Sequence, residues 1–206
     1  LALASYKALK EYDWCKLLVV TDHIKDVFDR QVEEPNQEEE IKKQIPILEE
    51  INNSISSKVR VQYEESPYPR WINLELRLES SPTSKVFDEI KLKLHDNKIT
   101  ETARPEILIA GCGTGQQLVS NASYENSDIL AVDLSLSSLS FAKRKMQELN
   151  HTNIEFLHGD ILNLNNLNKK FSVIECVGVL HHLKYPEEGL KVLLNILEPN
   201  GYLKLG

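Results

Sequence analysis

From residue 106 onward, short apolar runs alternate with segments whose apolar residues recur at helical spacing. The runs predict buried strands and the segments between them predict helices. Strands separated by helices at this rhythm indicate parallel strands, right-handed crossovers and helices on both faces. We therefore expect a doubly wound, mostly parallel, Rossmann-like α/β sheet. The expected strands are Ile107–Ala110, Ile129–Val132, Ile154–Leu157, Phe171–Val177 and a fifth after 199–201, with helices over 116–121, 136–149 and 186–197.

Ahead of this region the pattern is mainly helical. Apolar residues between Ala2 and Val32 predict one or two helices, and the charged segment 33–43 predicts a solvated linker or a helix start. Residues 45–61 are also helix-like, with Pro46 marking the start because proline lacks an amide donor. A further helix is expected over Pro82–Leu94. We expect a helical N-terminal extension (1–60), a linker strap and helix (61–104) and a core (105–206).

The first predicted strand runs into three alternating glycines, Gly111, Gly113 and Gly115, which leave the backbone bare enough for a ligand to touch. Asp133 ends the next strand, eighteen residues after Gly115, where a carboxylate suits ribose hydroxyls. Together they predict a site for a nucleotide-like cofactor. A dinucleotide fingerprint would place its third glycine where Gln116 stands, so the pattern points away from NAD. The glycines could instead serve a tight turn only, and Asp133 could cap the following helix.

Composition narrows the class of protein. With 24 Lys and Arg against 31 Asp and Glu, the net charge of −7 disfavours nucleic acid as a partner. No apolar run reaches the roughly 20 residues needed to cross a bilayer. The three cysteines lack a C-x-x-C spacing, which fits reduced thiols, a cytoplasmic location and no metal site. The chain starts at Leu1, and its single methionine is Met146, so we expect a fragment of a longer protein.

Five ordered motifs, covering about half the chain, resemble class I S-adenosylmethionine-dependent methyltransferases. They are the segments 107–117, 131–135, 159–161, 171–183 and 197–201. The resemblance implies that the glycine loop cradles the methionine moiety, that Asp133 holds the ribose, and that Asp160 and Ile161 border the adenine. It implies S-adenosylmethionine as cofactor, with S-adenosylhomocysteine as product. The implied cofactor contacts are Gly111, Cys112, Gly113, Gly115, Gln116, Asp133, Leu134, Asp160, Ile161 and Val177.

Two further segments, 62–71 and 179–183, resemble methyltransferase domains that follow tetratricopeptide repeats in bacterial proteins. This narrower resemblance implies a helical N-terminal cap and an upstream repeat domain in the full-length protein, although residues 1–60 show no clear repeat signature. Family members continue past the fifth strand with two more strands, which are absent from this sequence.

Tyr63, Tyr68, Arg70 and Trp71 crowd together in a segment whose two prolines favour extended backbone. One interpretation is a packed strap that holds the N-terminal helices on the sheet. The other is a lid or substrate contact, with Arg70 meeting a carboxylate and an aromatic ring covering the cationic sulfur of the cofactor. The sequence leaves both open.

His181 and His182 follow the fourth strand, at the edge where open α/β sheets bind ligands. They could act as catalytic bases, contact substrate, or pack. Cys112 and Cys176 are expected to be buried fillers. The end of the fourth strand lacks an Asn/Asp-Pro-Pro-aromatic motif, which favours a small-molecule or protein acceptor. We therefore expect a methyltransferase; the alternatives are a non-catalytic cofactor-binding or interaction module and an NAD-dependent oxidoreductase.

Overall fold

The computed structural model describes residues 1–49, 61–74, 81–89, 91, 99–121 and 124–206. It divides the chain into two units, Leu1–Gln44 and Ile45–Gly206. The domain boundary expected after residue 60 borders the segment 50–60, outside the described residues, and the three-part division stays a prediction. Within the described ranges, no helix combines the length and the apolar character needed to cross a membrane.

The N-terminal unit consists of short helices around a small core. In chain order these are η1 (Ala2–Ser5), η2 (Leu9–Glu11), η3 (Asp13–Leu17), α1 (Asp22–Phe28), the π-helical turn η4 (Asp29–Glu33) and α2 (Glu34–Lys42). Leu9, Cys15 and Val32 are its buried core. Gln31 joins the helices, because its Oε1 accepts from the Leu9 amide at 3.0 Å and its Nε2 donates to the Ala4 carbonyl at 3.0 Å.

The π-helical turn has a cause in the sequence. Pro35 lies in the first turn of α2, and it has no amide hydrogen to donate to the preceding helical turn. A wider turn just before a proline relieves the clash with the carbonyl behind it. The charged segment 33–43 therefore continues the helix that begins with α1, and it is neither the linker nor the helix start that the sequence offered.

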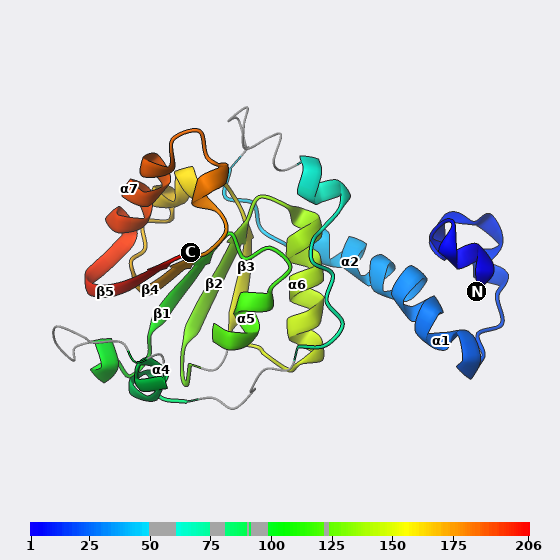
Figure 1. Cartoon of the computed structure of the whole chain (residues 1–206), viewed down its shortest axis with the longest axis horizontal. Helices are drawn as coiled ribbons and strands as arrows, with labels where there is room; N and C mark the ends of the chain where they lie inside the picture. Colours follow the sequence, from blue (N-terminus) through cyan, green and yellow to red (C-terminus); the bar gives the residue numbers. More distant parts are fainter. Residues whose placement is uncertain (50–60, 75–80, 90, 92–98, 122–123) are drawn as a thin grey trace. The chain divides into compact units, whose positions relative to one another are not determined.

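The larger unit is organised by a five-stranded parallel sheet (Figure 1). Its strands are β1 (Glu106–Ala110), β2 (Asp128–Asp133), β3 (Ile154–His158), β4 (Phe171–Cys176) and β5 (Leu197–Leu205). They lie in the order β3-β2-β1-β4-β5, so the winding direction reverses between β1 and β4. A crevice forms where neighbouring crossovers leave a parallel sheet in opposite directions, at the carboxyl ends of its strands. The predicted doubly wound α/β fold is confirmed.

Helices cover both faces of this sheet. They are α4 (Thr83–Glu89), η5 (Ile99–Glu101), α5 (Gln116–Asn121), α6 (Leu136–Glu148), η6 (Ile161–Leu167), η7 (Leu180–His182) and α7 (Pro186–Ile196). Figure 1 shows α5 and α6 on one face and α7 on the other. The predicted stripe of α6 is buried at Leu139, Ala142 and Met146. On the opposite face, Leu164 of η6 and Leu193 of α7 pack with Leu108 and Ile174 of the sheet.

The helix predicted from Pro46 is wrong where the chain is described. Pro46–Leu48 pairs with the end of β3 instead: the His158 amide donates to the Pro46 carbonyl at 2.9 Å, and the Leu48 amide donates to the His158 carbonyl at 2.9 Å. Pro46 suits this position because the residue before a proline prefers extended backbone and only the Pro46 carbonyl is needed. The remainder of that predicted helix, 50–60, lies outside the described residues.

Three other boundaries differ from the prediction. Residues 61–65 are helical, so the extended backbone starts only near Pro67. The helix from Pro82 is described as far as Glu89. Strand β5 already pairs at Leu197, and residues 198–201 bulge opposite Ser172 before pairing resumes at Tyr202. The expected turn at 199–201 is thus a bulge within the strand.

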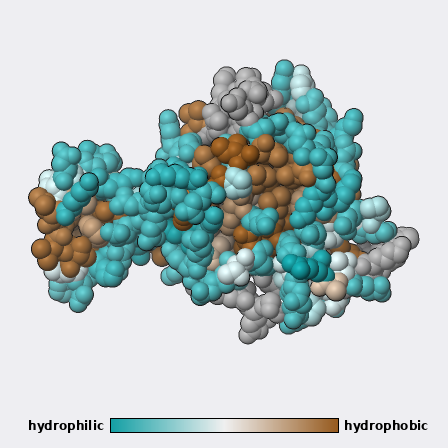
Figure 2. Space-filling view, turned by 180° about the vertical axis from the view of Figure 1, so that it is seen from behind, coloured by the Kyte–Doolittle hydropathy of each residue, from teal (hydrophilic) through white to brown (hydrophobic). Residues whose placement is uncertain are grey.

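The N-terminal unit exposes much of its apolar surface (Figure 2). Leu17 and Val19 are each 82% exposed, and Leu1 and Leu3 are also exposed. A unit of this size buries few side chains, so its core is small compared with that of the sheet.

Candidate functional site

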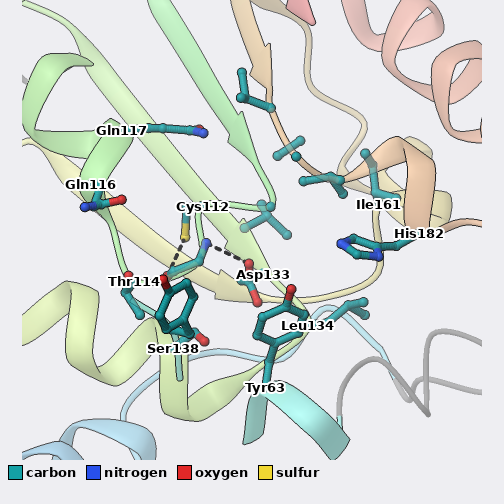
Figure 3. Close-up of a pocket in the computed structure, with 18 of the residues that line it drawn as sticks. Tyr63, Cys112, Thr114, Gln116, Gln117, Asp133, Leu134, Ser138, Ile161 and His182 are labelled. Carbon is teal, nitrogen blue, oxygen red and sulfur yellow. Dashed lines mark hydrogen bonds between the residues drawn. The ribbon is translucent and has the colours of Figure 1, made fainter. Parts of the chain in front are cut away.

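The glycine loop between β1 and α5 is tied to the end of β2. The amides of Gly111 and Cys112 both donate to the Val132 carbonyl, at 2.8 and 3.0 Å. The Gly113 amide donates to Asp133 Oδ2 at 2.8 Å (Figure 3). Two buried strands therefore bring the loop and the carboxylate together, as the spacing predicted.

Two of the glycines have different roles in the loop. Gly113 has a φ of +52°, and a Cβ placed on it would meet nothing within 4 Å, so its backbone borders open space. Gly115 has a φ of +85°, and its Cβ would lie 2.9 Å from the Ala142 Cβ of α6. Positive φ favours glycine at both positions. Gly113 leaves room for a ligand, whereas Gly115 lets α6 approach the loop.

Asp133 is the central polar group of the site. Its Oδ2 accepts from Gly113, and its Oδ1 accepts from the Ser135 amide at 2.9 Å. Desolvation raises the pKa of Asp133 above its ordinary value, and these amides and nearby His158 oppose the rise. The helix-capping role belongs to Ser135, whose hydroxyl accepts from the Ser138 amide at 3.0 Å. Asp133 is therefore available to a ligand.

Asp133 and the glycine loop lie on the wall of a cavity of about 250 Å³ at the carboxyl ends of β1, β2 and β4. The predicted residues that line it are Gly111, Cys112, Gly113, Gln116, Asp133, Leu134, Ile161, Val177, Tyr63, Tyr68 and His182. Gly115, Asp160, His181, Arg70 and Trp71 were also predicted, but they do not line it. The wall also includes Thr114, Gln117, Ser138, Leu164 and Leu183, which sequence reasoning missed.

Asp160 is buried and serves the local backbone. Its Oδ1 accepts from the Leu162 amide at 3.0 Å and so caps the 3-10 helix η6. The next residue, Ile161, reaches the cavity wall. The ordinary loop chemistry of a Gly-Asp turn thus accounts for Asp160, and its predicted contact with adenine stays a prediction.

The loop after β4 brings only one of the two histidines into the cavity. The rings of His181 and His182 are 4.1 Å apart, but only His182 lines the wall. The His182 ring faces Tyr63 edge-on at 6.4 Å. Partial burial and the neighbouring His181 lower the pKa of His182, which favours the neutral imidazole at pH 7.

The cysteines have the properties of buried fillers. Burial, together with nearby Asp133, raises the pKa of the Cys112 thiol well above its ordinary value. Burial raises the pKa of Cys176 to about 11. Both side chains are therefore thiols near neutral pH, and neither is activated as a nucleophile.

The aromatic and basic residues of segment 63–71 lie in two different environments. Tyr63 and Tyr68 line the cavity, as a lid would. Trp71 is buried, and its indole Nε1 donates to the Thr114 carbonyl at 2.9 Å. The Arg70 guanidinium lies 4.6 Å from the centre of the Phe141 ring on α6. Arg70 and Trp71 therefore pack against α6 and the glycine loop, and their predicted hold on the N-terminal helices stays a prediction.

Comparison with known proteins covers most of the region that builds this cavity. Residues 107–201 match the family model of a methyltransferase domain. An uncharacterised protein of Synechococcus sp. is 37% identical over 107 residues, which cover 51% of this chain and 26% of that protein. The mitochondrial ubiquinone biosynthesis O-methyltransferase of Schizosaccharomyces pombe is 31% identical over 102 residues, which cover 48% of this chain and 36% of that protein. The chain thus spans about a quarter to a third of these relatives.

A solved structure with the same fold is the [4+2]-cyclase SpnF, with a TM-score of 0.54 and 18% identity. The similarity covers 73% of this chain and 59% of SpnF. At this identity the match concerns the fold alone, and a fold can support different reactions. The motif order, the sheet topology and the family match all agree with S-adenosylmethionine as the cofactor. Residues 107–201 are therefore similar to a methyltransferase domain, with the motif order and sheet topology of class I S-adenosylmethionine-dependent methyltransferases.

Proposed function

We propose that residues 45–206 form a methyltransferase unit that binds S-adenosylmethionine in the cavity beside Asp133 and transfers its methyl group to an acceptor. The single observation that carries this proposal is the meeting of the Gly113 backbone and the Asp133 carboxylate on one cavity wall. Gly113 follows β1 and Asp133 ends β2. A tight turn after β1 alone would not require a carboxylate from β2.

The residues of the cavity fit this cofactor chemically. Gly113 has no side chain, and the space beside its backbone is open. Each Asp133 oxygen accepts one backbone hydrogen bond and retains a lone pair for a ribose hydroxyl. Leu134, Ile161 and Leu164 provide apolar surface for a flat base. The donors, acceptors and apolar surface thus match an adenosine group with a polar tail.

When bound, S-adenosylmethionine supplies an activated methyl group on a positively charged sulfur. The glycine loop and Asp133 would fix its position, since methyl transfer depends on alignment. Tyr63 and Leu183 would exclude water from the site. Neutral His182 would accept a proton from the acceptor at an imidazole nitrogen.

Neutral His182 favours an acceptor that must lose a proton, such as a hydroxyl group. The similarity to ubiquinone biosynthesis O-methyltransferases supports the same choice. A small-molecule or protein acceptor remains the proposal from the sequence, with a hydroxyl as the favoured group. The upstream repeat domain in the full-length protein also stays a prediction.

Calorimetric titration of the purified chain with S-adenosylhomocysteine and, separately, with NAD tests the cofactor site. We expect saturable binding of the first and no binding of NAD. Binding of NAD in competition with S-adenosylhomocysteine would revive the oxidoreductase alternative. Transfer of labelled methyl groups to a panel of phenols, alcohols, amines and proteins then tests catalysis. Binding without transfer in the full-length protein would favour the non-catalytic module.

A further inference from the structure

A strap, residues 63–72, passes from the loop after β2 to the glycine loop. Its first anchor is Glu64, which does not line the cavity. The Glu64 carboxylate accepts from the Ser137 amide at 3.1 Å, the Ser137 hydroxyl at 2.9 Å and the Ser135 hydroxyl at 3.0 Å. The single Ser135 proton is shared with the Tyr63 carbonyl, 3.1 Å away.

This anchor also completes the start of α6. The first turn of α6 contains no acidic residue of its own. A helix N-terminus has unpaired amides and a partial positive charge, and both favour a carboxylate. Glu64 supplies that carboxylate from a segment more than 70 residues earlier in the chain, and the Ser137 amide donates to it. The contact therefore joins the strap to a rigid helix.

The second anchor lies at the other end of the strap. The Thr114 hydroxyl donates to the Pro69 carbonyl at 2.7 Å, and the Trp71 indole donates to the Thr114 carbonyl at 2.9 Å. Trp71 also packs edge-on against Phe141 at 5.9 Å, and Lys145 Nζ donates to the Ile72 carbonyl at 3.1 Å. Indole, hydroxyl and amine thus fix this end to the glycine loop and α6.

The two anchors lie on the two loops that form the proposed cofactor site. Ser135 follows Asp133 by two residues, and Thr114 separates Gly113 from Gly115. Tyr63 and Tyr68, which directly precede the anchor residues Glu64 and Pro69, line the cavity. Figure 3 shows the Tyr63 side chain pointing from its helical turn toward Asp133 and His182.

We propose that Glu64 is a positioning residue that holds Tyr63 against the cavity, so that cofactor affinity depends on a carboxylate outside the cavity wall. This inference rests on the proposed cofactor site. Tyr63 precedes Glu64 directly, and loss of the anchor would release the helical turn that carries both. If the strap were then closed in about a tenth of the molecules, the apparent dissociation constant would rise about tenfold.

The test compares Glu64→Ala with Glu65→Ala, which removes a similar charge from the next position of the same helical turn. Glu65 is exposed and makes no hydrogen bond or ion pair among the contacts of the described residues. Alanine has the same helix propensity at both sites. Calorimetry with S-adenosylhomocysteine should give a dissociation constant raised about tenfold for Glu64→Ala and unchanged for Glu65→Ala.

A double-mutant cycle with Tyr63→Ala separates positioning from general stability. If Glu64 acts through Tyr63, Glu64→Ala should change the affinity little once Tyr63 is absent. If the two losses multiply instead, the inference is wrong. If Glu64→Ala does not fold, Ser137→Ala removes one of its hydrogen bonds more gently, and we expect an affinity loss of about threefold.

The wild-type titration distinguishes the two levels of the proposal. Wild-type binding with equal affinities in Glu64→Ala and Glu65→Ala would overturn the positioning role and leave the cofactor site intact. Failure of the folded wild-type protein to bind S-adenosylhomocysteine would overturn the proposed cofactor site, and the positioning role with it.

Discussion

Two walls of the cavity are built in different ways. One wall, the glycine loop with Asp133, consists of residues that directly follow buried strands and are placed by strand pairing. The other wall, the strap of residues 63–72, has irregular backbone beyond its first turn and is held by side-chain contacts. The first wall is therefore set by the core of the sheet, whereas the second depends on a few anchors.

This difference assigns separate tasks to the walls. The sheet wall carries the groups that can recognise the adenosine and methionine parts, and its backbone hydrogen bonds fix them before a ligand arrives. The strap wall places aromatic rings over the cavity, and only a few contacts hold it there. Loss of Asp133 from the first wall should therefore weaken binding most, and substitutions in the anchors should weaken it less.

The largest effect is expected for Asp133→Ala. The change removes both acceptors proposed for the ribose, and hydrogen bonds to charged groups contribute about 1.5–3 kcal/mol each. We expect affinity for S-adenosylhomocysteine to fall at least about 100-fold, or ~2.7 kcal/mol. Calorimetry measures the loss, and circular dichroism checks that the protein is folded. A loss below about threefold would remove Asp133 from the binding site.

Gly113→Ala and Gly115→Ala sharpen the comparison within one loop. Both substitutions place a side chain at positive φ, which costs about 1–2 kcal/mol. The Gly113 methyl group would enter the ligand space, so we expect affinity to fall about tenfold. The Gly115 methyl group would meet Ala142, so we expect an additional loss of unfolding free energy of about 1–3 kcal/mol. Urea unfolding and ligand titration of both variants measure the two effects. A larger affinity loss in Gly115→Ala together with a larger stability loss in Gly113→Ala would contradict the prediction.

Trp71→Phe weakens the second anchor while keeping a ring against Phe141. Loss of the hydrogen bond to the Thr114 carbonyl should destabilise the closed position of the strap by about 1 kcal/mol. Because binding needs the closed strap, this corresponds to about a fivefold loss of affinity. Trp14→Phe in the N-terminal unit is the matched control, because Trp14 is the other tryptophan of the chain. Equal affinity losses in both variants would argue against the anchor.

The affinity should also depend on pH, through protonation of Asp133. Ribose hydroxyls would stabilise the ionised Asp133, whose pKa is raised in the free protein. Affinity should therefore fall as the pH drops through that raised pKa, by up to about tenfold per pH unit. The contribution of Asp133 to folding has the opposite sign: it is present at low pH and lost as the pH rises through the raised pKa. Calorimetry over a pH series measures the affinity, and Asp133→Asn should remove the dependence.

The sequence predicted the sheet wall because its signals are local. An apolar run, alternating glycines and a carboxylate after the next run are visible within 30 residues. It could not predict Glu64, because nothing in the sequence distinguishes Glu64 from Glu65. Their difference depends on Ser135 and Ser137, more than 70 residues away. It likewise grouped Arg70 and Trp71 with Tyr63 and Tyr68, since composition does not show which rings face the cavity.

Prolines were misjudged for a related reason. Pro46 fits a helix start as well as it fits an extended segment, and only the partner decides between them. That partner, the end of β3, lies more than 100 residues later. Pro35 gave the reverse case, since its local constraint shaped a π-helical turn within a helix.

The pairing of Pro46–Leu48 with β3 has a consequence for how the molecule meets other copies of itself. β3 is an outer strand of the sheet, and outer strands offer free amides and carbonyls on which foreign strands can grow. The segment occupies those groups at His158, the end of β3 nearest the cavity. Pro46 itself has no amide with which to extend the pairing outward. Strand addition from another molecule is therefore blocked at the edge where it would distort the cavity most.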